Sequence, residues 1–161
     1  PAPAQPNGDR PPATPANLAH PHRLAAAVSG ELREAADHLT PAQRELLALR
    51  ELLGLSYPEL ATVTGLPEPE VALALAGARL DLRTALRGPS ATVADCVERD
   101  RALQVIAGRQ DGLAVSAADE DWLIGHLGHC RACGQAHASM LEASACYRAW
   151  APDDGAGERP A

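Results

Sequence analysis

The sequence predicts an all-α protein built from two small helical units. Apolar residues recur every three or four positions over most of residues 24–150, as expected for helices that each bury one face. The chain has 161 residues with two Trp, two Tyr and no Phe. Its core is therefore expected to be aliphatic, and this composition favours short helices over sheets.

Both ends of the chain differ from the middle. Residues 1–22 are rich in Pro and Ala, and residues 151–161 are polar with Pro and Gly. Neither segment has an apolar period, so both are predicted to be disordered tails or linkers.

The first unit is predicted to cover residues 23–88 and to begin with a helix from Leu24. A second helix is expected to start at Thr40, with the Thr side chain as its cap and Pro41 in its first turn, and to stop at Gly54. The charged side chains expected to face solvent on this helix are Arg44, Glu45, Arg50 and Glu51.

Two further helices complete this unit. Ser56 is a cap for a short helix that ends at Gly65, and a third helix is expected from Glu68 to about Arg87. The small side chain of Ala61 allows the two helices to approach closely. Two helices joined by a Gly-containing turn are typical of the helix-turn-helix, and the alternative is an ordinary three-helix bundle.

The second unit is predicted to cover residues 92–150. A helix is expected from about Thr92 to Gly108, followed by a turn at Asp111-Gly112. Ser116 then caps a helix that Gly128 ends, and a final helix reaches about Trp150.

A metal-ligand motif joins the last two of these helices. His126, Cys130 and Cys133 follow the pattern H-x-x-x-C-x-x-C, in which successive ligands are about one helical turn apart. Cys96 lies 30 residues upstream and is the candidate fourth ligand. A Cys₃His set is typical of a closed, structural zinc site. The alternative is free buried thiols with a surface histidine.

Three other residues could take part in this chemistry. His129 and His137 could compete as ligands, although His129 directly precedes Cys130 and points away from the face of His126. Cys146 is outside the motif and is either a buried thiol or a partner in a redox reaction of the ligand cysteines.

Charge and composition exclude several functions. The formal net charge is −7 with a pI near 5.3, which counts against strong binding to DNA phosphates. We find no membrane-spanning run and no secretory signal, so four cysteines in this spacing indicate a reducing cytoplasm. Four protein ligands leave zinc no open position, and no nucleophile–base pair or phosphate loop is visible, so we expect no enzyme and no small-molecule substrate.

The first unit resembles region four of bacterial sigma factors of the extracytoplasmic-function type. The similarity is carried by residues 39–50 (LTPAQRELLALR), by residues 54–61 (GLSYPELA) and by Gly65-Leu-Pro. It implies a domain that reads the −35 promoter element and contacts RNA polymerase.

The helix that would read DNA departs from this family. The positions that would meet bases or phosphates are Ala72, Leu73, Ala74 and Ala76. None of these side chains can donate a hydrogen bond to a base edge or a phosphate, and Glu68 and Glu70 would repel DNA. Arg79, Arg83 and Arg87 form a stripe that could contact phosphates or simply face solvent.

The second unit resembles the zinc-binding anti-sigma domain, through its upstream Cys, its Asp-Gly-Leu turn and the H-x-x-x-C-x-x-C motif. The resemblance implies zinc ligation by Cys96, His126, Cys130 and Cys133, and binding to a sigma factor through apolar helix faces. Apolar residues that could bind such a partner, or could instead close the protein's own core, are Leu73, Met140, Leu141, Tyr147 and Trp150.

Two functions remain after this comparison. The first is a bacterial transcription regulator that contacts a sigma factor or an RNA polymerase subunit, with weak or absent binding to promoter DNA and no role at a membrane. Within it, the zinc unit could also pack on the apolar face of its own neighbour. The second is a −35 promoter reader controlled by its own zinc unit, which could also respond to oxidation.

Overall fold

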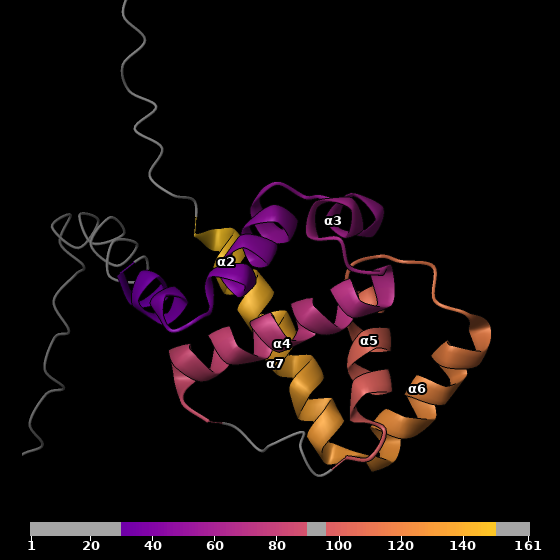
Figure 1. Cartoon of the computed structure of the whole chain (residues 1–161). Helices are drawn as coiled ribbons and strands as arrows, with labels where there is room; N and C mark the ends of the chain where they lie inside the picture. Colours follow the sequence, from indigo (N-terminus) through magenta and orange to yellow (C-terminus); the bar gives the residue numbers. More distant parts are fainter. Residues whose placement is uncertain (1–29, 90–95, 151–161) are drawn as a thin grey trace, which may run out of the picture.

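The computed structural model describes residues 30–89 and 96–150, and this part of the chain is entirely helical (Figure 1). The all-α fold class is therefore confirmed. The two predicted tails and the predicted helix start at Leu24 lie outside the described residues. The helical segments are residues 30–37, α2 (Pro41–Leu47), the π-helix η2 (Ala48–Leu52), α3 (Tyr57–Thr64), α4 (Glu68–Arg87), α5 (Arg99–Gln110), α6 (Ala117–His129) and α7 (Arg131–Ala149).

The helix starts of the first unit lie where local sequence places them. Thr40 caps α2 by accepting a hydrogen bond from the backbone N–H of Gln43 at 3.2 Å. Ser56 precedes α3, and the Glu59 carboxylate accepts its backbone N–H at 2.7 Å. Gly65 ends α3 with φ of 72°, a left-handed conformation that glycine adopts without strain. These side-chain partners satisfy backbone groups that a helix end leaves open.

The expected helix from Thr40 to Gly54 changes character in its second half. Residues 48–52 form η2, whose wider turn is followed by Gly54 at φ of 71°. The expectation that Glu51 faces solvent is wrong, because Glu51 is buried within η2.

The first helix of the second unit is shorter than predicted. α5 begins at Arg99, and Cys96 lies in the turn before it, where its carbonyl accepts the N–H of Arg99 at 3.1 Å. The expected start near Thr92 lies outside the described residues. Gly128 does not end α6, which continues to His129, and the extended backbone of Cys130 separates α6 from α7.

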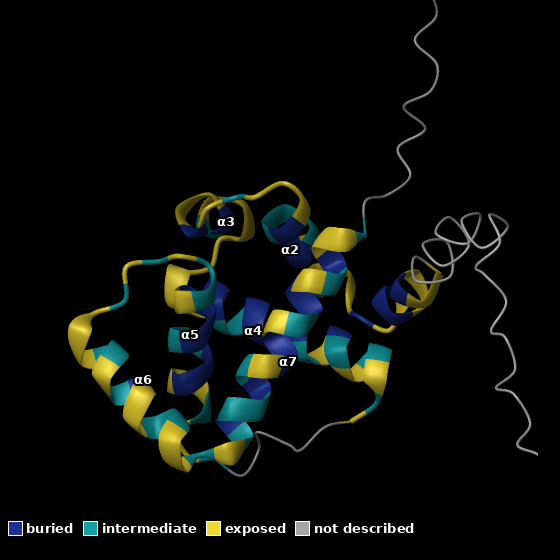
Figure 2. Cartoon of the chain, turned by 180° about the vertical axis from the view of Figure 1, so that it is seen from behind, coloured by how far each residue is buried: buried dark blue, intermediate teal, exposed yellow. Residues whose placement is uncertain are grey.

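One core serves both predicted units. α4 packs against α2 and α3 and also against α5 and α7, with α7 crossing it (Figures 1 and 2). Both predicted units contribute residues to this core. They include Leu47, Leu60, Leu75 and Leu82 from the first unit and Leu103, Ile106, Leu123 and Met140 from the second. The predicted boundary near residues 88–92 stays a prediction, but the two halves are packed on one another.

No helix in the described ranges is long and apolar enough to cross a membrane.

Candidate metal centre

The four predicted metal ligands lie together at one end of α5, α6 and α7. Cys96 comes from the turn before α5, His126 from the last turn of α6, and Cys130 and Cys133 from the junction and first turn of α7. Their ligand atoms all lie within 4.8 Å of one another. Cys133 is buried and the other three side chains are half-buried, so the cluster could hold a metal ion close to the surface.

The spacing of these atoms suits a small, tetrahedral ion. His126 Nε2 is 3.5 Å from Cys96 Sγ. Ligands at about 2.0–2.3 Å from zinc stand roughly 3.3–3.8 Å apart in a tetrahedron. The cluster is therefore near this size, and three sulfurs with one imidazole form a donor set that zinc accepts.

The two thiols of the C-x-x-C pair differ in acidity. Burial, followed by hydrogen bonds with neighbouring cysteines, raises the pKa of Cys133 to about 12. A backbone hydrogen bond from Cys133 is the main cause that lowers the pKa of Cys130. A bound cation would draw both into the thiolate form that ligates metal.

The competing candidates lie away from this cluster. His129 is exposed, and its Nδ1 faces the carbonyl oxygen of Gly125. His137 is half-buried, and burial together with the positive charge of Arg109 lowers its pKa. Neither histidine, nor Cys146, belongs to the group of four.

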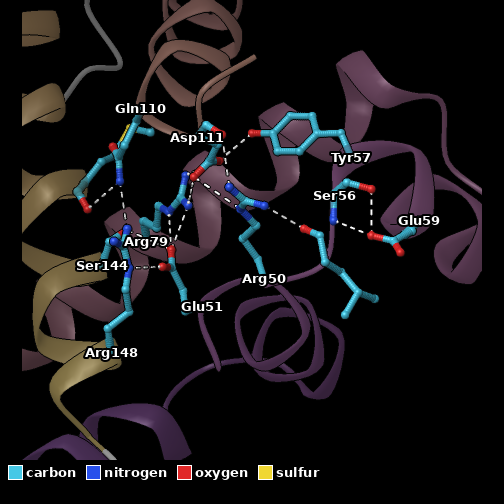
Figure 3. A network of polar contacts seen from close by, with 12 residues as sticks. Arg50, Glu51, Ser56, Tyr57, Glu59, Arg79, Gln110, Asp111, Ser144 and Arg148 are labelled. Carbon is cyan, nitrogen blue, oxygen red and sulfur yellow. Dashed lines mark hydrogen bonds and ion pairs between the residues drawn. The ribbon is translucent and has the colours of Figure 1, made fainter. Parts of the chain in front are cut away.

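A second polar centre, which the sequence interpretation missed, lies at the other end of α5 and α7 (Figure 3). Its middle is Arg79 of α4, which is fully buried. Arg79 donates to Glu51 of η2 at 2.7 and 2.9 Å and to Asp111, which follows α5, at 2.7 and 3.0 Å. Tyr57 also donates to Asp111, at 2.7 Å.

The network extends into α7. Ser144 donates to Glu51 at 2.8 Å, and Gln110 donates to Ser144 at 2.8 Å. Arg148 donates to the second carboxylate oxygen of Glu51 at 2.7 Å. Hydrogen bonds therefore connect η2 and α4 in the first unit with α5 and α7 in the second.

Burial and charge act in opposite directions on the central carboxylate. Burial alone would raise the pKa of Asp111, but hydrogen bonding and positive charge from Arg79, with contributions from Tyr57 and Arg50, lower it overall. Asp111 is therefore ionised and pairs with the buried guanidinium.

The predicted DNA-contacting stripe is not a uniform exposed surface. The prediction for Arg79 is wrong, since its guanidinium lies inside the core and pairs with the carboxylates of Glu51 and Asp111. Arg83 and Arg87 both pair with Glu142 of α7, at 3.2 and 3.1 Å. The burial of Arg79 could have been predicted from the sequence, because Arg79 is four residues after Leu75 and three before Leu82, on the apolar face of α4.

The predicted partner-binding residues divide in the same way. Met140 and Tyr147 are buried in the protein's own core, so their assignment to a partner surface is wrong. Leu73 and Trp150 are half-buried against the core. Leu141 is 48% exposed and remains available for contact.

Comparison with known families supports the first half of this organisation. Residues 29–82 match the family model described as Sigma-70, region 4, which spans about a third of the chain. A region-four helix-turn-helix domain is therefore present, with a helical part after it. Such a domain indicates a sigma-like or sigma-interacting transcription regulator, a non-enzymatic class. No curated protein and no solved structure matches the chain.

Proposed function

We propose that this protein is a bacterial transcription regulator that acts by contact with a sigma factor or an RNA polymerase subunit. Its region-four domain supplies the scaffold, and its C-terminal helices form a zinc-binding module of the anti-sigma type. Such a regulator would work in the cytoplasm, where the polymerase acts. DNA binding is at most a minor activity in this proposal.

The observation that carries the proposal is the packing of α4. This helix, the second of the helix-turn-helix, would have to enter the DNA major groove if the domain read a promoter. In this chain α5 and α7 pack on it, and its buried face contains Ala72 and Ala76. Its exposed first turn carries Glu68 and Glu70, which would meet DNA phosphates with like charge.

The charge balance of the domain points in the same direction. Residues 40–88 contain five arginines and six acidic residues. One of these arginines, Arg79, is buried, and two others pair with Glu142. Little positive charge is left to release counterions from DNA, which is the main source of nonspecific affinity.

Zinc is the metal proposed for the cluster of Cys96, His126, Cys130 and Cys133, with a structural role. The ion would tie the turn before α5 to α6 and α7. Four protein ligands close the coordination sphere, so no position remains for a substrate or a reactive water.

Two binding measurements test the proposal. At physiological salt, we expect no sequence-dependent shift of a −35-type duplex, but stoichiometric binding to purified RNA polymerase core or to an extracytoplasmic-function sigma factor. A Leu141→Asp variant tests the exposed part of α7, and Ala138→Asp is a control on another exposed position of the same helix. A tight, sequence-specific duplex shift together with no protein binding would overturn the proposal.

The second candidate function, a promoter reader held in check by its own zinc module, has one observation in its favour. Among carboxylates of the described residues, Glu142 is the one that pairs with Arg83 and Arg87. Arg87 is exposed and Arg83 half-buried, and ion pairs open to solvent exchange easily. If they are masked phosphate contacts, Glu142→Gln increases DNA affinity and its salt dependence. Replacing both arginines with Ala in that variant should abolish the gain; unchanged DNA binding in Glu142→Gln removes this candidate.

A further inference from the structure

We propose that Trp122 is a positioning residue for the ligand His126, and that Arg101 holds Trp122 in place. The inference rests on the proposed zinc site and adds a support that the metal-ligand motif does not include. Its evidence is a chain of contacts that runs from α5 across α6 to the ligand cluster.

The first contact is between two rings on α6. Trp122 and His126 are one helical turn apart, and their ring centroids lie 4.9 Å apart with an angle of 18° between the planes. The Nε2 atom of the same imidazole is 3.5 Å from Cys96 Sγ. The Trp122 indole therefore covers one face of the His126 imidazole, and the Nε2 edge of the imidazole points into the cluster.

The second contact holds the indole from a different helix. The guanidinium carbon of Arg101, on α5, lies 4.0 Å from the centroid of the Trp122 ring, within the range of a cation–π interaction. Arg101 also donates to Asp119 at 3.0 Å. Asp119 in turn accepts a hydrogen bond from Ser116 at 2.7 Å, at the start of α6.

This arrangement gives His126 support that the cysteines do not need. Cys130 and Cys133 lie at the junction and first turn of α7, and each thiol rotates about one side-chain bond, whereas the longer side chain of His126 rotates about two. A stacked indole restricts that rotation before the ion arrives. Groups that orient a metal ligand typically contribute about 10- to 100-fold in metal affinity.

The composition of the chain makes this contact easy to observe. Its two tryptophans are Trp122 and Trp150, and Trp150 packs against Tyr147 at the far end of α7 with a centroid distance of 5.5 Å. In Trp150→Phe, all tryptophan emission comes from Trp122. We expect Zn²⁺ to change this emission and Co²⁺ to quench it, while Trp122→Phe, which keeps only Trp150, responds much less.

The decisive measurement is zinc affinity by competition with a chromophoric chelator. Trp122→Leu should bind Zn²⁺ about 10- to 100-fold more weakly, and Trp122→Phe, which retains an aromatic face, should recover most of the loss. Arg101→Met should lie between wild type and Trp122→Leu. Ile124→Ala, an exposed α6 position outside the cluster, is the matched control and should bind as wild type.

The outcomes separate this inference from the proposed function. A wild-type protein that takes up no zinc would refute the metal site itself. A wild type that binds zinc, with Trp122→Leu binding equally tightly, would refute the positioning role alone. If Trp122→Leu does not fold, as judged by circular dichroism, the emission of Trp150→Phe decides, because an unchanged signal on zinc binding contradicts the stack.

Discussion

Arg79 sits in the core between two carboxylates that belong to distant parts of the chain. Without the charge of Arg79, Asp111 keeps only Arg50, at 3.4 Å, and Glu51 keeps only Arg148, at 2.7 Å, among the cations of the described residues. Because these two arginines compensate in part, the loss should lie toward the lower end of the range of about 3–5 kcal/mol that breaking a buried ion pair typically costs. We therefore expect Arg79→Met to lower the free energy of unfolding by about that amount, as measured by urea denaturation. Arg79→Lys should recover only part of it, because an ammonium cannot reproduce the planar fork.

The control for this change is Arg33→Ala. Arg33 is exposed and forms no ion pair within the part of the chain that the structure covers. Its replacement should alter the free energy of unfolding by less than about 0.5 kcal/mol. Equal effects of the two substitutions would contradict a central role for Arg79.

Asp111 makes the stability of the network depend on pH. Its folded pKa is lowered, so its contribution is fully present above the unfolded pKa of about 4. That contribution is lost as the pH falls through the folded pKa. Asp111→Asn should therefore be less stable than wild type at pH 7, and the difference should shrink on acidification.

Acid also releases a bound metal ion, so the effect of Asp111 protonation has to be measured without metal. Urea unfolding of both proteins between pH 7 and pH 3 in the presence of a chelator removes that contribution. A difference in unfolding free energy that stays constant over this range would show that the charge of Asp111 is not the cause.

At the level of the helices, two glycines provide an opposed pair of substitutions. Gly65 ends α3 at φ of 72°, whereas Gly77 is inside α4, where an added Cβ would meet no heavy atom within 4 Å beyond its chain neighbours and the backbone of its own helix. Gly65→Ala should destabilise the protein by about 1–2 kcal/mol, the cost of a left-handed residue with a side chain. Gly77→Ala should stabilise it by roughly 0.5–1 kcal/mol, since Ala favours helix.

Thermal unfolding followed by circular dichroism measures both changes. The two substitutions add the same methyl group, so opposite shifts in melting temperature isolate backbone conformation as the cause. A loss of stability in Gly77→Ala would mean that α4 is less regular than described.

The sequence predicts the starts of α2, α3 and α6 well, places the start of α5 too early, and says little about how the helices pack. The Thr40 and Ser116 hydroxyls each accept a backbone N–H three residues on, and the backbone N–H of Ser56 donates to the Glu59 carboxylate, so the effect of each residue is local. The burial of Arg79 depends on Asp111, which is 32 residues away. Periodicity places an arginine on a helix face but contains no information about which partner covers that face.

The same distinction applies to the metal cluster. The spacing of His126, Cys130 and Cys133 predicted three of its members, because one turn of helix fixes their relation. Cys96 was predicted because a tetrahedral site needs a fourth ligand and because the family resemblance implies one upstream. Its approach to His126 results from tertiary packing. The support by Trp122 was missed, although its place one turn before His126 is a detectable pattern.

Considered as a whole, the molecule has two polar centres joined by two helices. α5 and α7 begin beside the metal-ligand cluster and end at the Arg79 network, since Cys96 precedes α5 and Asp111 follows it. Cys133 opens α7, and Ser144 lies near its end. Loss of order at the cluster should therefore affect the complete fold.

Chelation tests this expectation. Free Zn²⁺ at 100 times its dissociation constant should stabilise the folded protein by about 2.7 kcal/mol relative to the chelated form. We also expect a single unfolding transition, with circular dichroism and tryptophan emission changing together, because both halves share one core. Two separate transitions, with only one of them sensitive to chelator, would indicate that the halves unfold independently.

Because α4 packs against helices of both halves, isolating the region-four segment alone has a practical consequence. Cutting the chain after Pro89 would remove α5 and α7, which pack on α4, and leave the Arg79 guanidinium facing only one of its two carboxylates. Such a fragment would expose apolar surface and would be prone to self-association. Any affinity for a duplex seen with it would describe a surface that the intact polypeptide keeps out of water.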